Sequence, residues 1–213
     1  MGGAPVIRNV SGRFSFLGSF PGALPALPLP EVAFAGRSNV GKSSALNRLL
    51  GAKAAARVSS TPGRTQAINL FQIGDHGVFA DLPGYGFAKV PDAIKGAWKG
   101  MIEEYLGNRD ALRLVVVLVD SRRAVQESDG MMRYALVESG IPCLVVATKV
   151  DKLSRNERLV GLAALRRDLR LPSDEPIGFS GVTGEGFDAV WDRIEAAFAA
   201  PPITRTAEPD LEV

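Results

Sequence analysis

The sequence predicts an α/β fold with a mostly parallel six-stranded sheet, one antiparallel strand and helices on both faces. After Pro30, short apolar runs alternate with amphipathic stretches, which is the pattern of parallel strands joined by crossover helices. The connection at residues 74–77 is too short for a parallel crossover, so the runs on either side of it must form an antiparallel hairpin. The chain of 213 residues, 46% of them hydrophobic, suits one domain with a large core.

The expected elements follow one another in chain order. Short apolar runs bounded by turn residues predict strands over residues 32–35, 68–73, 78–81, 112–120, 143–148 and 177–180. A helix is expected to open at Ser44, and helices over residues 94–106 and 187–198 each have apolar residues spaced along one face. Trp98 and Trp191 belong to these two apolar faces, so we expect both in the core.

The chain divides into three expected regions: a Pro-rich N-terminal extension over residues 1–30, the main domain over residues 31–200, and a disordered acidic tail over residues 201–213. A targeting peptide is an alternative for the extension, but its prolines interrupt any continuous apolar helix. No apolar run approaches transmembrane length, and the one cysteine, Cys143, lies in an apolar run that suits a buried thiol in a reducing compartment. We therefore expect a cytoplasmic protein that does not bind membranes.

The motif GRSNVGKS, at residues 36–43, lies between the first strand of the main domain and the helix at Ser44. It matches the pattern G-x-x-x-x-G-K-[ST], in which backbone N–H groups surround a phosphate chain. Gly36 and Gly41 leave that approach open, Lys42 would neutralise the outer phosphates, and Ser43 would offer its hydroxyl to Mg²⁺. The alternative is a glycine turn with a surface lysine, but the flanking strand and helix favour the phosphate site.

Basic residues are concentrated around this motif. Residues 32–74 contain no Asp or Glu but six Lys or Arg. Part of this positive charge can serve a bound nucleotide, and the remainder either faces a polyanion such as RNA or is simply a solvated surface.

Two further segments have the residues that a nucleotide site needs. Asp81 and Gly84, in DLPG, could hold Mg²⁺, generally through water, and bind a terminal phosphate through the glycine N–H. Asp151, in TKVD, could accept hydrogen bonds from a ring N–H and an amino group arranged as in guanine, a pattern that adenine does not present. Both segments follow predicted strands, so they should meet Lys149 and Ser180 at the carboxyl edge of the sheet.

These segments together resemble the EngB/YihA/YsxC family of ribosome-biogenesis P-loop GTPases, within the translation-factor-related class. The resemblance covers residues 31–199 and is carried by PEVAFAGRSNVGKSS, SSTPGRTQAINLF, DLPGYGFAKV, TKVDKL and FSGVTGEG. It implies a Ras-like P-loop GTPase domain that binds GTP or GDP with Mg²⁺ and hydrolyses GTP. It also implies a switch that binds the large ribosomal subunit precursor or its rRNA, assists subunit assembly, and so supports cell growth and division.

The resemblance also implies the site residues. Lys42, Thr65 and Gly84 would act in catalysis, and Ser43, Thr65 and Asp81 would hold Mg²⁺. Residues 63–67 would be the first switch and residues 83–89 the second. The nucleotide would contact Gly36, Arg37, Ser38, Asn39, Val40, Gly41, Lys42, Ser43, Ser44, Gly63, Arg64, Thr65, Gln66, Ala67, Asp81, Leu82, Pro83, Gly84, Thr148, Lys149, Val150, Asp151, Phe179, Ser180 and Gly181.

Three positions depart from related GTPases. Gly181 stands where Ala or Ser is usual, which matters little if only its N–H is needed. Thr148 replaces a common Asn, as in the EngB-like group, and we expect modest nucleotide affinity as a result. Tyr85 stands where Ras-like enzymes have the glutamine that orients water, so intrinsic hydrolysis should be slow, about 10⁻⁴ to 10⁻² per second.

An added positive charge would then be required for fast hydrolysis. Asn39 matches the asparagine with which potassium-activated GTPases bind K⁺, although it could merely brace the loop. Arg64 is a second candidate and is better suited to a partner contact. Two alternatives to the switch remain: a nucleotide-gated binding module with incidental GTPase activity, and an ATP-using P-loop enzyme. We expect a monomer and no DNA partner.

Overall fold

The computed structural model describes residues 13–52, 55, 67–85 and 92–204, with side chains in the last range described from residue 100 onward. Within these residues the elements are β1 (Phe14–Phe20), β2 (Glu31–Gly36), α1 (Lys42–Leu49), β3 (Ile68–Ile73), β4 (Gly77–Asp81), α2 (Asp92–Asn108), β5 (Leu112–Asp120), α3 (Glu127–Glu138), β6 (Cys143–Thr148), η1 (Val150–Lys152), α4 (Arg155–Asp168), β7 (Ile177–Gly178) and α5 (Phe187–Phe198).

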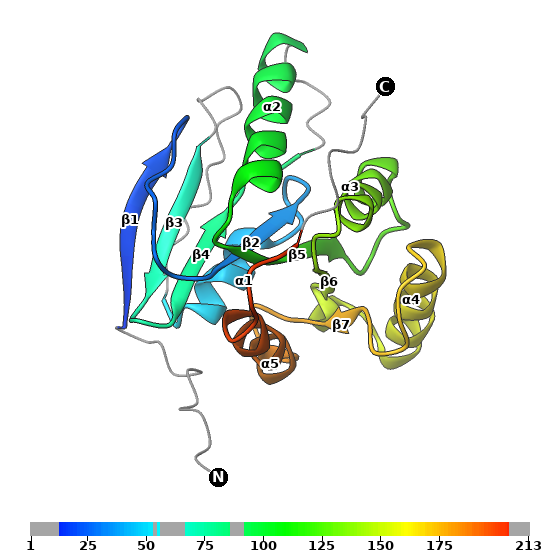
Figure 1. The fold of residues 1–213 in the computed structure, drawn as a ribbon. Coiled ribbons are helices and arrows are strands. Elements are labelled where there is room, and N and C mark those ends of the chain that lie inside the picture. The colour runs from blue at the N-terminus through cyan, green and yellow to red at the C-terminus, as the bar shows by residue number, and fades with distance from the viewer. Residues whose placement is uncertain (1–12, 53–54, 56–66, 86–91, 205–213) are drawn as a thin grey trace.

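The strands form one sheet in the order β1-β3-β4-β2-β5-β6-β7, which Figure 1 shows from β1 at one edge toward β7 at the other. β3 is antiparallel to both of its neighbours, whereas the remaining pairs are parallel. The predicted hairpin is present as β3 and β4, with Ile73 opposite Gly77. The mostly parallel α/β sheet with a single antiparallel strand is therefore confirmed.

The sheet has seven strands rather than the six predicted. The additional strand, β1, comes from the region expected to be an extension, and it pairs with β3 from Phe14 opposite Ile73 to Phe20 opposite Ile68. The ring centroid of Phe16 lies 5.3 Å from that of Phe71. β1 is stabilised by this distant partner strand, and its own short, glycine-containing sequence gives little indication of a strand.

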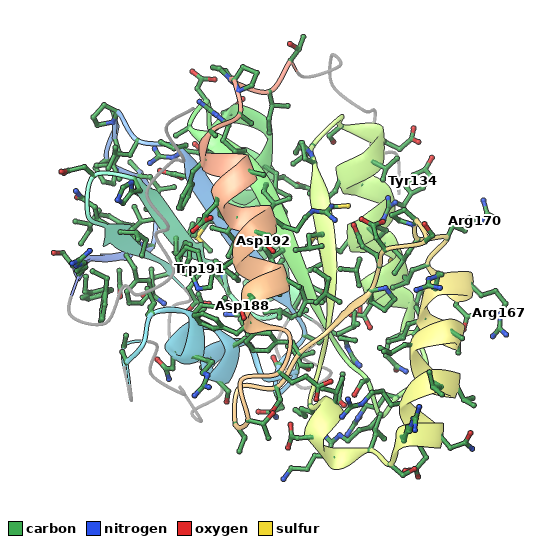
Figure 2. All side chains as sticks on the ribbon, turned by 90° about the horizontal axis from the view of Figure 1, so that it is seen from below. Tyr134, Arg167, Arg170, Asp188, Trp191 and Asp192 are labelled. Carbon is green, nitrogen blue, oxygen red and sulfur yellow. The ribbon has the colours of Figure 1, made fainter. Side chains whose placement is uncertain are left out.

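Helices cover both faces of the sheet, as predicted. α1 and α5 pack on one face, and α2, α3 and α4 contribute to the apolar cluster on the other. Trp191 of α5 is fully buried, with its ring centroid 5.5 Å from that of Phe79 in β4. In Figure 2, α5 lies in front of the sheet with Trp191 labelled on it, and Tyr134 and Arg167 are labelled to the right. None of the described helices combines the length and the apolar character needed to cross a membrane.

Two local expectations need correction. α1 begins at Lys42, two residues before the predicted Ser44, because the left-handed Gly41 places the chain directly in the helix. Cys143 is only partly buried, since it is the first residue of β6 and packs at the margin of the core, and this burial raises the pKa of its thiol. Trp98 lies where side chains are not described.

Candidate nucleotide-binding site

The loop after β2 adopts backbone conformations that favour glycine and asparagine. Between Gly36 at the end of β2 and Lys42 at the start of α1, Asn39 and Gly41 have φ of +63° and +105°. No side chain caps the first turn of α1, which contains no acidic residue. The helix therefore presents N–H groups and the positive end of its dipole to the loop, as an anion-binding site requires.

Ser38 adds a further donor beside this helix end. Among the described residues its hydroxyl is buried without a hydrogen-bond partner. A Cβ built on Gly84 would lie 3.2 Å from that hydroxyl, so the loops after β2 and β4 approach each other closely. Leaving a buried donor unpaired costs about 1–3 kcal/mol, which a phosphate oxygen could offset by accepting its hydrogen bond.

Lys42 and Asp81, which are 39 residues apart, form an ion pair. Asp81 is the last residue of β4 and is 7% exposed, and its second carboxylate oxygen accepts a hydrogen bond from Asn69 Nδ2 at 3.3 Å. Asn69 was not predicted. It lies directly opposite Asp81 in the β3–β4 hairpin, and the register of that hairpin is the signal that could have identified it.

The TKVD segment begins at the last residue of β6 and is hydrogen-bonded to the same loop. Thr148 Oγ1 lies 2.6 Å from the carbonyl oxygen of Val40 and 3.0 Å from that of Val119. Lys149 has φ of +62°, and its Nζ donates to the carbonyl of Asn39 at 2.6 Å. The predicted base-binding segment and the predicted phosphate loop are therefore neighbours.

Asp120 was not predicted, although it holds Lys149 in place. It ends β5, and its Oδ2 accepts a hydrogen bond from Lys149 Nζ at 2.9 Å. Burial acts to raise the pKa of Asp120, but hydrogen bonds from Arg122 and Lys149 outweigh it and hold that pKa well below the usual range. Its position, an acidic residue ending an apolar strand at the carboxyl edge of the sheet, is the signal that sequence reasoning could have used.

Asp151 is oriented by Ser180, which follows β7. Ser180 Oγ donates to Asp151 Oδ1 at 2.7 Å and accepts hydrogen bonds from the N–H groups of Val182 and Thr183 at 3.2 and 3.0 Å. The hydrogen bond from Ser180 lowers the pKa of Asp151. Asp151 thus remains an ionised acceptor, with its side chain fixed at the edge where Lys149 also lies.

Several predicted contact residues can meet a ligand only through their backbone. Their side chains are at most 5% exposed and lie in the interior: Val40, Leu82, Val150 and Phe179. Pro83 is also buried, whereas Arg37, Ser43 and Ala67 are half-buried and Ser44 is exposed. Gly63, Arg64, Thr65 and Gln66, like residues 86–89 of the expected second switch, lie outside the described residues.

The side chain of Tyr85 points toward α3. Its phenol donates a hydrogen bond to Asp129 Oδ1 of α3 at 3.1 Å, and the side chains of both residues are buried. Burial, followed by the nearby Asp129 carboxylate, raises the pKa of Tyr85 well above its ordinary value. The phenol is therefore a neutral donor and cannot serve as a base in this arrangement.

Comparison with known proteins identifies the family. The sequence model of the family of 50S ribosome-binding GTPases matches residues 31–149. The chain belongs to this GTPase family. Its members bind guanine nucleotides and hydrolyse GTP, so the chain is a GTPase.

Individual relatives agree with this assignment. A probable GTP-binding protein EngB from Geobacter metallireducens is 50% identical over 190 residues, which are 89% of this chain and 93% of that protein. A protein of the same name from Exiguobacterium is 48% identical over 177 residues, 83% of this chain and 90% of that one. A crystal structure of a probable GTP-binding protein EngB aligns with a TM-score of 0.66 at 26% identity, covering 79% of this chain and 98% of that one. The predicted EngB resemblance and Ras-like GTPase fold are thus confirmed.

Proposed function

We propose that this GTPase is a cytoplasmic, monomeric switch that assists assembly of the large ribosomal subunit, binding the subunit precursor or its rRNA in the GTP form. The observation that carries the proposal is the junction at the loop after β2. Lys42, which begins α1 directly after that loop, contacts Asp81, and Lys149 contacts the carbonyl of Asn39, which supports a single site made from the phosphate and base motifs. The ribosomal part is supported by the family to which the chain belongs.

The phosphates of GTP would lie over the first turn of α1. Lys42 would exchange its contact with Asp81 for the outer phosphates, and the uncapped N–H groups of α1 and the hydroxyl of Ser38 would donate to phosphate oxygens. The N–H of Gly84 would bind the terminal phosphate, because Gly84 already lies against Ser38.

Ser43, Thr65 and Asp81 would hold Mg²⁺. A hydroxyl, a carboxylate and phosphate oxygens are the hard oxygen ligands that Mg²⁺ prefers, generally with water completing the octahedron. Ser43 follows Lys42 in the first turn of α1, and Asp81 contacts Lys42. Ser43 and Asp81 are therefore both neighbours of Lys42. Bound Mg²⁺ would supply positive charge to the phosphate oxygens.

Asp151 would select guanine. Its carboxylate, fixed by Ser180, would accept hydrogen bonds from the ring N–H and the amino group of the base, while the backbone of Gly181 would contact the guanine oxygen. Lys149 would lie along the base and keep the P-loop carbonyl of Asn39 in place.

The reaction is attack of water on the γ-phosphorus. A bond forms between the water oxygen and that phosphorus, the bond to the β–γ bridging oxygen breaks, and the water proton leaves with inorganic phosphate. Lys42 and backbone N–H groups would stabilise the developing charge. Because the hydroxyl of Tyr85 is hydrogen-bonded to Asp129, it would not orient the attacking water. Fast turnover would therefore require K⁺ at Asn39 or a group from the ribosomal partner.

A nucleotide-gated binding module with incidental GTPase activity is the second candidate. The observation that favours it is the same hydrogen bond of Tyr85, which leaves the position after Gly84 without a catalytic group. Turnover measured with and without large ribosomal subunits, in K⁺ and in Na⁺, separates the two functions. Strong stimulation by subunits or K⁺ supports the switch, and subunit occupancy that follows GTP binding without turnover supports the module.

Two variants test the site itself. Lys42→Ala should reduce GTP turnover by at least 10²-fold, as expected for removing a principal charge-stabilising donor. Turnover at the wild-type rate would show that the phosphates bind elsewhere. Asp151→Asn should weaken GTP binding and reduce the preference for GTP over ATP, whereas an unchanged preference would favour an ATP-using enzyme.

A further inference from the structure

We propose that Asp129 is a positioning residue for GTP binding. Its carboxylate holds the phenol of Tyr85 against α3, and so keeps Gly84 beside the phosphate loop. This inference rests on the proposed contact between the N–H of Gly84 and the terminal phosphate. It assigns a role to a residue of α3 that lies outside all five segments of the nucleotide motifs.

The backbone of Tyr85 is attached to the phosphate loop on both sides. Its N–H donates to the carbonyl of Gly36 at 3.3 Å, and its carbonyl accepts from the N–H of Ser38 at 3.1 Å. Tyr85 thereby forms a parallel bridge with Arg37, beyond the end of β4. Gly84 is the residue immediately before this bridge, so a displacement of Tyr85 shifts the Cα atom of Gly84 and, through it, the preceding peptide group, which carries the Gly84 N–H.

The side chain of Tyr85 supplies an anchor that the backbone alone does not. Its hydroxyl lies 3.1 Å from Asp129 Oδ1, and Tyr85 and Asp129 are 3% and 5% exposed. A buried hydroxyl that loses its acceptor is costly, so the phenol will leave this position only if it finds another partner. The hydrogen bond therefore ties the start of the expected second switch to a helix.

Asp129 is itself held in one orientation. Its Oδ2 accepts a hydrogen bond from the N–H of Gln126, as part of the capping box at the start of α3. One carboxylate thus serves both the helix terminus through Oδ2 and the phenol through Oδ1. Leu136 in the same helix is fully buried, which anchors α3 to the core.

A small pocket borders Asp129, the acceptor in this contact. Its volume is about 150 Å³, and its lining includes Arg37, Ser38, Gln126 and Asp129. The Nε atom of Arg37 is buried without a hydrogen-bond partner among the described residues. The ring of Tyr85 packs in the apolar cluster on the face covered by α2, α3 and α4, and its hydrogen bond to Asp129 fixes the phenol within that packing.

The two nucleotides should depend differently on this anchor. A triphosphate reaches the N–H of Gly84 in the proposed site, whereas a diphosphate lacks the phosphate that would do so. Loss of the contact between Tyr85 and Asp129 should therefore weaken binding of the triphosphate and leave binding of the diphosphate nearly unchanged.

The test compares four variants of the full chain: Tyr85→Phe, Asp129→Ala, the double variant, and Glu157→Ala. The last is a matched control, because Glu157 closes the capping box of α4 as Asp129 closes that of α3, without contacting Tyr85. Calorimetry with Mg²⁺ measures the affinity of each protein for a non-hydrolysable GTP analogue and for GDP. The ratio of the two affinities is the readout, since a general loss of stability weakens both.

We expect Tyr85→Phe and Asp129→Ala each to lower the ratio about threefold to tenfold, as for one buried hydrogen bond. The double variant should match the single variants within about twofold, because both remove one interaction. Unchanged ratios in the single variants, multiplied effects in the double variant, or an equal effect of Glu157→Ala would each overturn the proposal. Failure of the wild-type protein to bind either nucleotide would instead refute the proposed site.

Discussion

A Cβ atom built on Gly181 would lie 2.9 Å from the carbonyl oxygen of Ser44, in the first turn of α1. Real Cβ atoms essentially never approach a backbone atom this closely. The loop that follows β7 therefore packs directly on the helix that follows the phosphate loop, and only glycine permits the contact. The absence of the usual Ala or Ser at this position has a steric reason in this chain.

Gly181→Ala should weaken binding of GTP and GDP alike, by about tenfold. The added methyl group must displace either the loop bearing Ser180 or the first turn of α1, and both belong to the proposed nucleotide site. Gly107→Ala in α2 is the control, because a Cβ there meets nothing within 4 Å. It should leave affinity unchanged and stabilise the fold by about 0.5–1 kcal/mol. Equal affinities of the Gly181→Ala and wild-type proteins would show that the loop adjusts freely.

Thr148→Val should loosen the contact between the base segment and the phosphate loop. Valine has nearly the same shape, but it removes the hydroxyl that lies 2.6 Å from the carbonyl oxygen of Val40. We expect a loss of about 1–3 kcal/mol in the free energy of unfolding and a parallel loss of GDP affinity, because a buried carbonyl loses its donor. Thr204→Val, at an exposed position outside the predicted site, is the control. If both variants behave alike in chemical denaturation, the hydroxyl of Thr148 contributes little.

The sequence was sufficient for most of the fold because the decisive signals are local. Each strand from β2 to β6 is an apolar run, and the four-residue connection before Val78 allows only a hairpin. The phosphate loop could be predicted because its motif specifies glycines at positions where left-handed backbone occurs, as at Gly41. β1 was missed because a partner strand, rather than its own sequence, stabilises it.

The predicted site residues omitted those that hold others in place. Asp129 lies 44 residues from Tyr85, and Asp120 lies 29 residues from Lys149. Neither carboxylate belongs to a motif, and each acquires its partner only when α3 and β5 are packed beside the nucleotide loops. Such contacts depend on tertiary packing, so the sequence could have suggested only that Asp120 lies at the carboxyl edge of the sheet, and not which residue either carboxylate contacts.

Asp120→Asn should reduce the dependence of stability on acidic pH. Hydrogen bonds from Arg122 and Lys149 outweigh burial and lower the pKa of Asp120 in the folded state, below the unfolded value of about 3.9. The unfolded chain therefore binds this proton first as pH falls. The stabilisation from Asp120 is present above that unfolded value and is lost as pH falls toward the folded pKa.

Denaturation series between about pH 5 and pH 2 can measure this effect. As pH falls through this range, the free energy of unfolding should decrease less steeply for the Asp120→Asn protein than for the wild type. Arg122→Ala should change this slope in the same direction, but by less. If the free energy of unfolding of Asp120→Asn depended on pH as steeply as that of the wild type, the assignment of this carboxylate to the pair with Lys149 would be contradicted.

Arg109→Ala, just after the end of α2, should be strongly destabilising. Arg109 Nε lies 2.9 Å from Glu31 Oε2, and the hydroxyl of Tyr105 donates to the same oxygen at 3.1 Å. Glu31 is fully buried, so removing the guanidinium leaves an uncompensated charge in the interior, at a cost of about 3–5 kcal/mol. Arg167→Ala is the control. Arg167 is exposed and pairs with the neighbouring Asp168, so its loss should change the free energy of unfolding by no more than about 1 kcal/mol.

Urea denaturation measures the free energy of unfolding of Arg109→Ala and Arg167→Ala. Arg109 lies just beyond the C-terminal end of α2, and Glu31 begins β2, so this ion pair fixes the end of α2 that is remote from the expected second switch. Tyr105→Phe, which removes one donor but leaves the ion pair, should cost only about 1 kcal/mol. If Arg109→Ala were no more costly than Tyr105→Phe, water would have to reach Glu31 in the variant, and the ion pair would contribute little to holding the end of α2.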